Sequence, residues 1–285
     1  KPDFYSIIPE FLISSNYKTD ASSGFDAISQ AIESLFSKKS THASILFAKR
    51  SLNILLKNYI PFLGKKNLNN SYKMALGANL AGKAINISKT TAPHALSYPF
   101  TALFNVPHGH AVSLTLNKFL KFNYNHLDKS SCNFNLSKRF QLLFDLTGSR
   151  NFSELDYFLN KLKKNARLEQ NFFKLGINIK EEINKIVGGL NNQRLANNQV
   201  PIYKKDIKYI LKACEMLKKH DIFFLEEPLH PHDLKGFIEL TANSPIRIAT
   251  GESLTKVEEF YPFIQKRGLD VAQPDVQQMG ISGLR

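Results

Sequence analysis

The spacing of apolar residues changes near residue 215, and this change limits the folds that the chain can adopt. Before it, apolar side chains recur at helical intervals, as at Phe25, Ile28, Ile32 and Leu35, and no segment alternates cleanly as a strand does. After it, short apolar runs alternate with helical segments, as in β/α units. The sequence therefore predicts a mainly α fold over residues 1–214 and a partial β/α region over residues 215–285.

The helical region is expected to begin with a pair of helices within residues 21–63. Asp20 or Ser22 can cap the first helix, and the loop Gly64–Asn67 ends the second. The other helices of this region are predicted over residues 74–87, 140–162 and 206–217. In the second region, strands are predicted at 222–225, 246–249 and 269–272, and helices at 234–241 and 257–266. This order is typical of a parallel sheet or a TIM-like barrel.

Composition supports the same division and excludes several classes of protein. Residues 1–214 contain 30 basic side chains, 13 acidic ones and 24 asparagines, whereas residues 215–285 contain 8, 11 and 1. Because the net charge of +14 is spread over the first region rather than clustered, we expect no nucleic-acid partner. Apolar runs fall short of the roughly 20 residues of a membrane span. Two cysteines and no signal peptide favour a soluble chain in the reducing cytoplasm.

A carboxylate and two imidazoles form the most specific chemical pattern of the first region. Asp26 and Gln30 are four residues apart and share one helix face. His94 and His108 come from two later segments, and together with Asp26 they form a thiolate-free donor set that suits Fe(II) or Zn(II). Either histidine alone is more simply explained as a polar residue at a helix end. The combination with Asp26 is what indicates a metal site.

This order of motifs resembles the iron-containing (group III) alcohol dehydrogenases, specifically their C-terminal helical metal-binding domain, which is of the dehydroquinate synthase type. The resemblance covers residues 1–213 and includes the closing segment Arg194–Asn198. It implies metal ligands at Asp26, Gln30, His94 and His108. Gln30 departs from the pattern, since histidine is common there, and this leaves open binding by three ligands or a different metal preference.

The same resemblance implies two further residues at the reacting centre. Tyr98 stands where many members have a second histidine, and its hydroxyl would orient substrate or its ring would pack. His110 would relay a proton or support the site structurally. The implied reaction transfers hydride between NAD(P) and a small aldehyde or alcohol, with the metal as Lewis acid. The family's nucleotide-binding domain has no counterpart in these residues, so we expect no turnover by this chain alone. A homodimer is left open.

The segment before His94 offers one cation and three hydroxyls, at Ser88, Lys89, Thr90 and Thr91. Such groups suit a cluster of anionic oxygens. The segment resembles the branch of the family that comprises the phosphonoacetaldehyde reductases (hydroxyethylphosphonate dehydrogenases), and this resemblance implies that the four residues bind the substrate's phosphonate. A surface loop without a ligand is the equally weighted alternative.

The tail resembles a second family, the enolase superfamily, in its mandelate racemase and sugar-acid dehydratase branch. The motifs are Phe224–Leu229, Ile246–Glu252 and Asp270–Asp275, each about one β/α unit apart, so their carboxylates are expected at the same end of adjacent strands. The resemblance implies Mg²⁺ ligands at Glu226 and Glu252, with Asp275 as the partner of a catalytic histidine. Another carboxylate ligand, the lysine base and that histidine have no counterpart here.

Three interpretations follow from these two resemblances. The first is a metal-dependent, NAD(P)-linked alcohol dehydrogenase or aldehyde reductase, acting on phosphonoacetaldehyde as one candidate substrate. The second is a fragment of a Mg-dependent acid-sugar dehydratase of the enolase superfamily. The third is a non-catalytic chimera from a recombined or misassembled gene, because the change of pattern falls within a helix that both families would contain.

Overall fold

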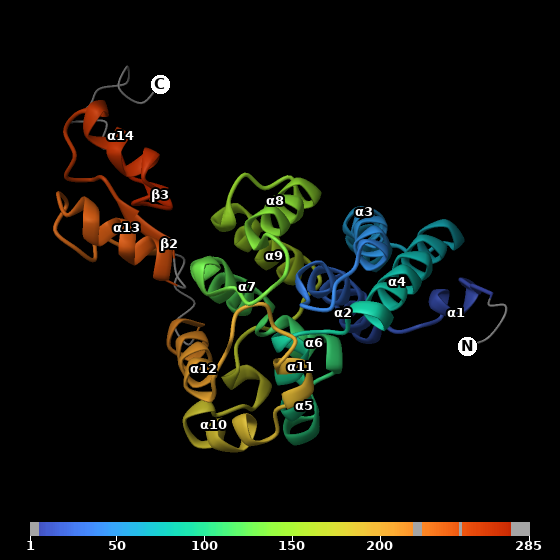
Figure 1. Cartoon of the computed structure of the whole chain (residues 1–285). Coiled ribbons are helices and arrows are strands. Elements are labelled where there is room, and N and C mark those ends of the chain that lie inside the picture. Colours follow the sequence, from blue (N-terminus) through green and yellow to red (C-terminus); the bar gives the residue numbers. More distant parts are fainter. Residues whose placement is uncertain (1–5, 219–223, 245–246, 275–285) are drawn as a thin grey trace. The chain divides into compact units, whose positions relative to one another are not determined.

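The computed structural model describes residues 6–218, 224–244 and 247–274, and these form two compact units (Figure 1). The first unit is residues 1–212 and the second is residues 213–285. Each is described by itself. Within the described residues, no helix combines the length and the apolar content needed to cross a bilayer.

The first unit is built from helices, as predicted. The α-helices are α1 (Glu10–Ile13), α2 (Tyr17–Phe36), α3 (His42–Gly64), α4 (Leu68–Ser88), α5 (Ala92–Phe104), α6 (His108–Ser113), α7 (Leu116–Asn125), α8 (Leu136–Thr147), α9 (Phe152–Asn165), α10 (Ile179–Gly188), α11 (Asn192–Leu195) and α12 (Lys204–Lys218). Two short 3₁₀ turns, η1 (Leu127–Lys129) and η2 (Phe173–Leu175), lie between them.

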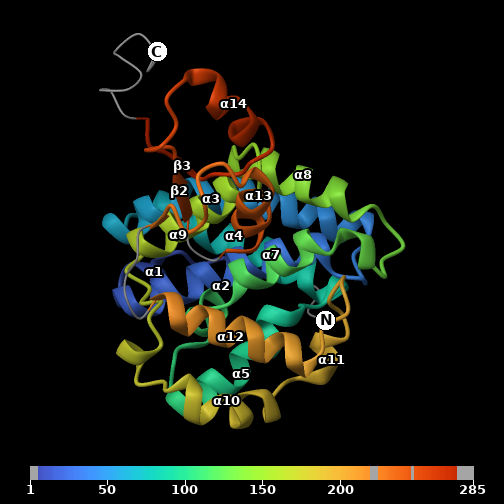
Figure 2. The same ribbon diagram turned by 90° about the vertical axis from the view of Figure 1, so that its left-hand side faces the viewer.

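Helix α2 is the centre of this unit. It packs against α3, α4 and α6 (Figure 1), and Figure 2 shows α2, α3 and α4 from a second direction. Its apolar residues, among them Phe25, Ile28, Ile32 and Leu35, are completely buried in the main core. Burial of an aliphatic or aromatic side chain stabilises a fold by about 1.5–3 kcal/mol. The helix that carries Asp26 is therefore firmly held.

Asparagine side chains begin many of the helices, which gives a structural use to the high asparagine content of residues 1–214. The side chain of Asn16 accepts a hydrogen bond from the backbone N–H of Thr19 at the start of α2. Equivalent caps begin α4, α8, α9, α10 and α11, at Asn67, Asn135, Asn151, Asn178 and Asn191. The predicted caps of α2 were wrong: Ser22 lies inside the helix, and buried Asp20 pairs with Lys66.

The single helix predicted over residues 140–162 is two helices, α8 and α9. Gly148 ends α8 in the left-handed conformation, with φ of 70°, and Asn151 caps α9. The two helices place their apolar faces on the same core, so the helical periodicity continues across the break. The prediction was wrong because this periodicity outweighed the Gly and Asn signals between the helices.

The second unit contains a three-stranded parallel sheet in the order β1 (Phe224–Glu226), β2 (Arg247–Thr250) and β3 (Val271–Ala272). Leu225 is opposite Ile248, and Thr250 is opposite Ala272. Helices α13 (Leu234–Asn243) and α14 (Val257–Gln265) connect the strands. A small core contains Phe237, Ile248, Leu254, Phe260 and Phe263. The predicted alternation of strands and helices is confirmed within the described residues.

Candidate metal centre

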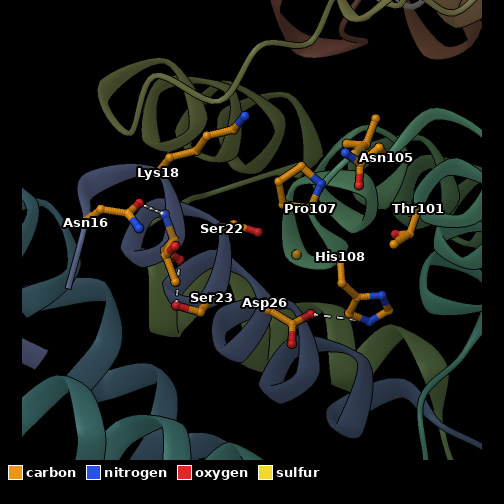
Figure 3. A pocket seen from close by; sticks show the side chains of 12 residues that line it. Asn16, Lys18, Ser22, Ser23, Asp26, Thr101, Asn105, Pro107 and His108 are labelled. Atoms are coloured by element: carbon orange, nitrogen blue, oxygen red, sulfur yellow. Dashed lines mark hydrogen bonds and ion pairs between the residues drawn. The ribbon is translucent and has the colours of Figure 1, made fainter. Parts of the chain in front are cut away.

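Three helices bring one carboxylate and two imidazoles together. Asp26 lies in the middle of α2, His94 in the first turn of α5, and His108 is the first residue of α6. Their potential ligand atoms all lie within 4.8 Å of one another. Figure 3 shows the Asp26 carboxylate facing the imidazole of His108. No other group of this kind occurs in the ranges that the structure describes.

A single oxygen of Asp26 faces both rings. Its Oδ1 lies 3.2 Å from Nε2 of His94 and 3.8 Å from Nε2 of His108. The two imidazole rings meet edge to face, with centroids 5.3 Å apart. The same nitrogen of each ring is therefore directed to one small volume beside the carboxylate.

Glu33 fixes the other nitrogen of His94, and the sequence analysis did not identify this residue. Its Oε1 is hydrogen-bonded to Nδ1 of His94, and its Oε2 accepts hydrogen bonds from the backbone N–H and the hydroxyl of Thr91, at 2.6 and 2.9 Å. Glu33 is 2% exposed and His94 is 1% exposed. A carboxylate that holds the outer nitrogen of a histidine orients that ring for a metal. The available signal was its spacing, seven residues after Asp26 and two turns along the same helix face.

Gln30 lies between these carboxylates on α2. Its amide nitrogen donates a hydrogen bond of 2.7 Å to Oδ2 of Asp26. The side chain therefore contacts the predicted ligand set through Asp26, and in this arrangement it holds the carboxylate oxygen that does not face the imidazoles.

The electrostatics of the two histidines differ. Burial lowers the pKa of His94, but Glu33 and Asp26 raise it more strongly, and the result is a pKa of about 9. Without metal, His94 is consequently a cation that donates from both nitrogens. Burial lowers the pKa of His108, and the nearby charges of His94 and Arg194 act in the same direction, against Asp26.

Gly109 allows α6 to approach α2 closely enough to form this cluster. A Cβ at this position would lie 2.1 Å from the backbone oxygen of Ser22 and 2.6 Å from Cβ of Asp26. The adjacent backbone N–H of His110 donates to the Ser22 hydroxyl at 3.1 Å. Since His108 immediately precedes Gly109, this close contact also sets the position of one imidazole of the cluster.

A groove of about 500 Å³ opens beside the cluster. Asp26 and His108 form part of its lining, and the remainder comes from the beginning of α2, including Asn16 and Lys18, and from the end of α5 and the segment after it, including Asn105 (Figure 3). His108 is 38% exposed and Asp26 is 19% exposed. A small molecule can therefore reach the cluster at Asp26 and His108.

Tyr98 and Arg194 extend the site from His108. The centroid of the Tyr98 ring lies 5.6 Å from that of the His108 ring. The guanidinium of Arg194 lies over the Tyr98 ring, 5.0 Å from the centroid of that ring. Nη1 of Arg194 donates to Oγ1 of Thr90 at 2.7 Å. Arg194 was noted in the sequence as part of a closing motif, without a role at the site.

The four residues of the predicted anion-binding segment do not converge on one point. Ser88 is completely buried and bonds to Ser34, while Thr91 bonds to Glu33. Lys89 is exposed, and its ammonium donates to the backbone oxygen of Asn86. Thr90 alone contacts a cation of the site, Arg194. The segment is fixed by Nδ2 of Asn197, which donates to the backbone oxygens of both Ser88 and Thr90.

His110 has structural contacts. Its Nε2 is hydrogen-bonded to the backbone oxygen of Glu169 at 2.6 Å, and burial lowers its pKa. It is not part of the group formed by Asp26, His94 and His108. These contacts correspond to the supporting role that the sequence left as one alternative for His110.

Carboxylates of the second unit lie at the carboxyl ends of its strands. Glu226 is the last residue of β1 and accepts a hydrogen bond of 2.7 Å from Gln273, while Glu252 follows β2 and is exposed. The neighbouring Glu227 accepts hydrogen bonds from the backbone N–H of Gly251 and the hydroxyl of Ser253. Asp275 lies outside the described residues.

The donor set of the first unit fits a divalent metal. Two imidazoles and one carboxylate, with a partly open side, form the ligand type found in catalytic zinc and non-haem iron sites. The hydrogen bond that the outer nitrogen of His94 donates to Glu33 completes the fit.

Comparison with known proteins agrees with this geometry. Residues 20–214 match the model of the Fe-containing alcohol dehydrogenase family, C-terminal part, and the chain belongs to this family. Residues 196–285 match the model for enolase C-terminal domain-like proteins. Both resemblances seen in the sequence are thus confirmed, and the two matches overlap in residues 196–214, which include most of α12.

Two curated relatives represent the first match. The 4-hydroxybutyrate dehydrogenase of Clostridium kluyveri is 27% identical over 210 residues, which are 70% of this chain and 54% of the relative. The phosphonoacetaldehyde reductase of Streptomyces viridochromogenes is 29% identical over 126 residues, 44% of this chain and 32% of the relative. The second match is represented by the L-talarate/galactarate dehydratase of Salmonella typhimurium, which is 34% identical over 75 residues, 26% of this chain and 19% of that protein. The chain spans about half the length of the first relative.

Solved structures share the helical fold. Sulfoacetaldehyde reductase from Bifidobacterium kashiwanohense, in complex with NAD⁺, matches with a TM-score of 0.62 and 25% identity over 72% of this chain and 52% of that one. An alcohol dehydrogenase from Oenococcus oeni matches with a TM-score of 0.65 and 19% identity, over 72% of this chain and 54% of that one, which shows the fold alone.

Proposed function

We propose that the first unit is the metal-binding half of an NAD(P)-linked aldehyde reductase or alcohol dehydrogenase. The observation that carries the proposal is the cluster of Asp26, His94 and His108, with Glu33 holding the outer nitrogen of His94. The chain's membership of the Fe-containing alcohol dehydrogenase family supports the same reaction class. Fe(II) or Zn(II) is the metal that this donor set suits.

Each residue of the centre has a definite task in this proposal. Asp26, His94 and His108 would hold the ion, which when bound supplies Lewis acidity at a carbonyl oxygen. Gln30 and Glu33 orient two of these ligands through their hydrogen bonds. His110 keeps α6 in place through Ser22 and Glu169.

Tyr98 contributes position rather than charge. Its ring lies against His108 and is 37% exposed, so its hydroxyl is available to a substrate at the open side of the cluster. The half-buried groove beside Asp26 would limit the water around a reacting aldehyde and leave one side open for a second molecule.

The substrate class in this proposal is a small aldehyde with an anionic group. The matched 4-hydroxybutyrate dehydrogenase and phosphonoacetaldehyde reductase have names that describe a carboxylate and a phosphonate compound. Phosphonoacetaldehyde is the particular candidate. The nicotinamide half has to be supplied by additional chain, because these residues correspond to about half of such an enzyme. We therefore propose that the 285 residues by themselves do not turn over.

The tail supports a second candidate function, a Mg²⁺ site of an acid-sugar dehydratase. Its support is the place of Glu226 and Glu252 at the carboxyl ends of adjacent parallel strands. Mg²⁺ prefers near-octahedral oxygen coordination, and two carboxylates provide only part of it. The non-catalytic chimera would merely bind metal without turnover, or would be a partner-binding remnant.

Elemental analysis of anaerobically purified protein tests these candidates together. We expect one iron or zinc per chain in the wild type and in Glu226→Gln/Glu252→Gln, and loss of metal in His94→Ala/His108→Ala. Metal that is lost only from the glutamate variant would favour the second candidate. Absence of metal from all three proteins, after incubation with Fe(II) or Zn(II), would contradict the proposed function.

A further inference from the structure

The positive charge of Arg194 is connected to the metal-ligand cluster in space through one intervening side chain, that of Tyr98. Successive contacts join the His108 ring to the Tyr98 ring at 5.6 Å and the Tyr98 ring to the Arg194 guanidinium at 5.0 Å. Helix α11, which carries Arg194, packs on α5, which carries Tyr98. The guanidinium and the candidate metal ligands therefore face a common neighbour, Tyr98.

The charge of Arg194 is not neutralised by a protein carboxylate within the described ranges. The ion pairs found there involve other cations, while the guanidinium of Arg194 donates to the neutral hydroxyl of Thr90. Arg194 is only half-buried, so part of its donor edge is accessible. A guanidinium has five N–H donors, and its planar fork matches the oxygens of a carboxylate or a phosphonate.

The surroundings hold this guanidinium in one orientation. Its central carbon lies over the Tyr98 ring, 5.0 Å from the centroid, and Thr90, which receives its hydrogen bond, is 2% exposed. Asn197 in turn fixes the backbone of Thr90 through a hydrogen bond of 2.9 Å. Less conformational entropy is then lost when an anion binds, because the cation is already ordered.

Lys89, the cation singled out in the sequence, lacks these features. Its side chain is exposed, and its ammonium is bonded to the backbone oxygen of Asn86 on the end of α4. Arg194, one hundred positions after His94 in the sequence, supplies the positive charge near the cluster instead. Folding brings Arg194 to Thr90, the residue directly after Lys89.

We propose that Arg194, supported by Thr90 and stacked on Tyr98, binds the anionic end of a short aldehyde or alcohol whose oxygen lies at the Asp26–His94–His108 cluster. Arg194 is thus the residue that selects ω-carboxylate, phosphonate or sulfonate compounds over neutral ones of the same length. The inference rests on the proposed function for the position of the reacting end. The ligand passes Tyr98, whose ring lies 5.6 Å from the His108 ring and 5.0 Å from the Arg194 guanidinium.

The test measures binding rather than turnover. The full chain loaded with Zn(II) is titrated with 4-hydroxybutyrate and, separately, with 1-butanol, which has the same carbon chain without the charge, and the dissociation constants are measured by ligand-observed NMR. We expect the wild type to bind the anionic compound about tenfold more tightly, since a hydrogen bond to a charged group contributes enough for that factor. Arg194→Gln should lose this preference, and Arg194→Lys should keep part of it.

The matched control is Arg150→Gln, which removes the same charge from an exposed side chain paired with Glu154. It should leave the preference unchanged. Far-UV circular dichroism establishes that each variant is folded, and Arg194→Lys serves as the second variant if Arg194→Gln is not. Two results overturn the inference: a wild type without preference for the anion, or a folded Arg194 variant, Gln or Lys, whose preference is as large as that of the wild type.

The same titration separates this inference from the proposed function. In metal-free wild type and in His94→Ala/His108→Ala, the Arg194-dependent preference should remain, while binding of both compounds weakens. If removal of metal leaves both affinities unchanged, the proposed metal function fails and the anion site stands. If metal strengthens binding of both compounds but the wild type binds the anionic compound no more tightly than 1-butanol, the metal function stands and the anion site is excluded.

Discussion

At the residue scale, the order of hydrogen bonds explains how the cluster can hold a metal. Oδ1 of Asp26 faces the two imidazoles, and its other oxygen is held by Gln30. The Nε2 atoms of both histidines point to that same oxygen. The outer nitrogen of His94 is bonded to Glu33, so the ring is oriented before any ligand arrives. The centre therefore depends on Glu33 and Gln30 as well as on the ligands themselves.

Replacing Glu33 by Gln should weaken metal binding while the helix persists. The amide keeps the size of the side chain but removes the charge that orients His94 and favours its bond at Nδ1. Loss of such a partner typically costs 10–100-fold in metal affinity, and we expect a change of about that size. Competition with a chromophoric chelator measures it. Glu182→Gln, at an exposed ion pair with Lys185, is the control, and equal affinities in the two variants would contradict a role for Glu33.

Stability of the metal-free chain should fall as the pH rises through about 9. His94 has a pKa of about 9 in the folded chain, above the ordinary 6.5, so the folded state holds a proton that the unfolded state releases. The resulting stabilisation is fully present below pH 6.5 and is lost as the pH passes 9; it amounts to about 3 kcal/mol. Urea unfolding in a chelator between pH 6 and 10 measures it, by comparison with His94→Gln. Parallel curves for the two proteins would show that no such proton is held.

At the scale of elements, α2 combines the roles of scaffold and site. Its apolar residues fill the core, while Asp26, Gln30 and Glu33 follow one another along a neighbouring face. Helix α6 can bring His108 to that face only because Gly109 has no side chain. The precision of the centre is thus determined by the packing of α2, α5 and α6.

Gly109→Ala should displace α6 from α2 and weaken the metal site. The added Cβ would meet backbone and Cβ atoms, which cannot move aside as the end of a flexible side chain would. Overpacking of this kind destabilises a fold by about 1–3 kcal/mol. Gly82→Ala on α4, where nothing lies within 4 Å of a Cβ, is the matched control and should be neutral or stabilising. Thermal unfolding and metal affinity should change in Gly109→Ala alone, and equal behaviour of the two variants would contradict the close-contact argument.

The sequence predicted the elements better than the contacts between them. Asp26, His94 and His108 could be recognised as donors, and in the structure their potential ligand atoms lie within 4.8 Å of one another. Glu33 could not, because a glutamate on an amphipathic helix is more often solvated than buried. Arg194 and Thr90 are far apart in sequence, and their contact depends on the tertiary packing of α11 against α5. The break between α8 and α9 was missed because the apolar faces of both helices pack in the same core.

At the scale of the whole molecule, each of the two units has its own core, and the two cores are unequal. The main core comprises buried residues of α2, α3, α4, α7, α8 and α9, whereas the core of the second unit consists of five buried residues. Among the described strands, β1 and β3 each pair only with β2, so each leaves an edge of the sheet without a strand partner. Exposed strand edges favour association with other chains. The larger core of the first unit should therefore govern the stability of the chain. The strand edges of the second unit should govern its solubility.

Ending the chain after α12, at residue 218, should separate these two properties. The shortened chain retains the complete metal-ligand cluster, Glu33 and Arg194, so its metal stoichiometry and its melting temperature should equal those of the full chain. It lacks the strand edges, so its light scattering during heating should be lower. Glu226→Lys in the full chain, which places a charge of opposite sign at the edge strand β1, should lower the scattering in part. A shortened chain that loses its metal or melts at lower temperature would show that the helical unit depends on the tail, which would contradict an independent metal-binding half.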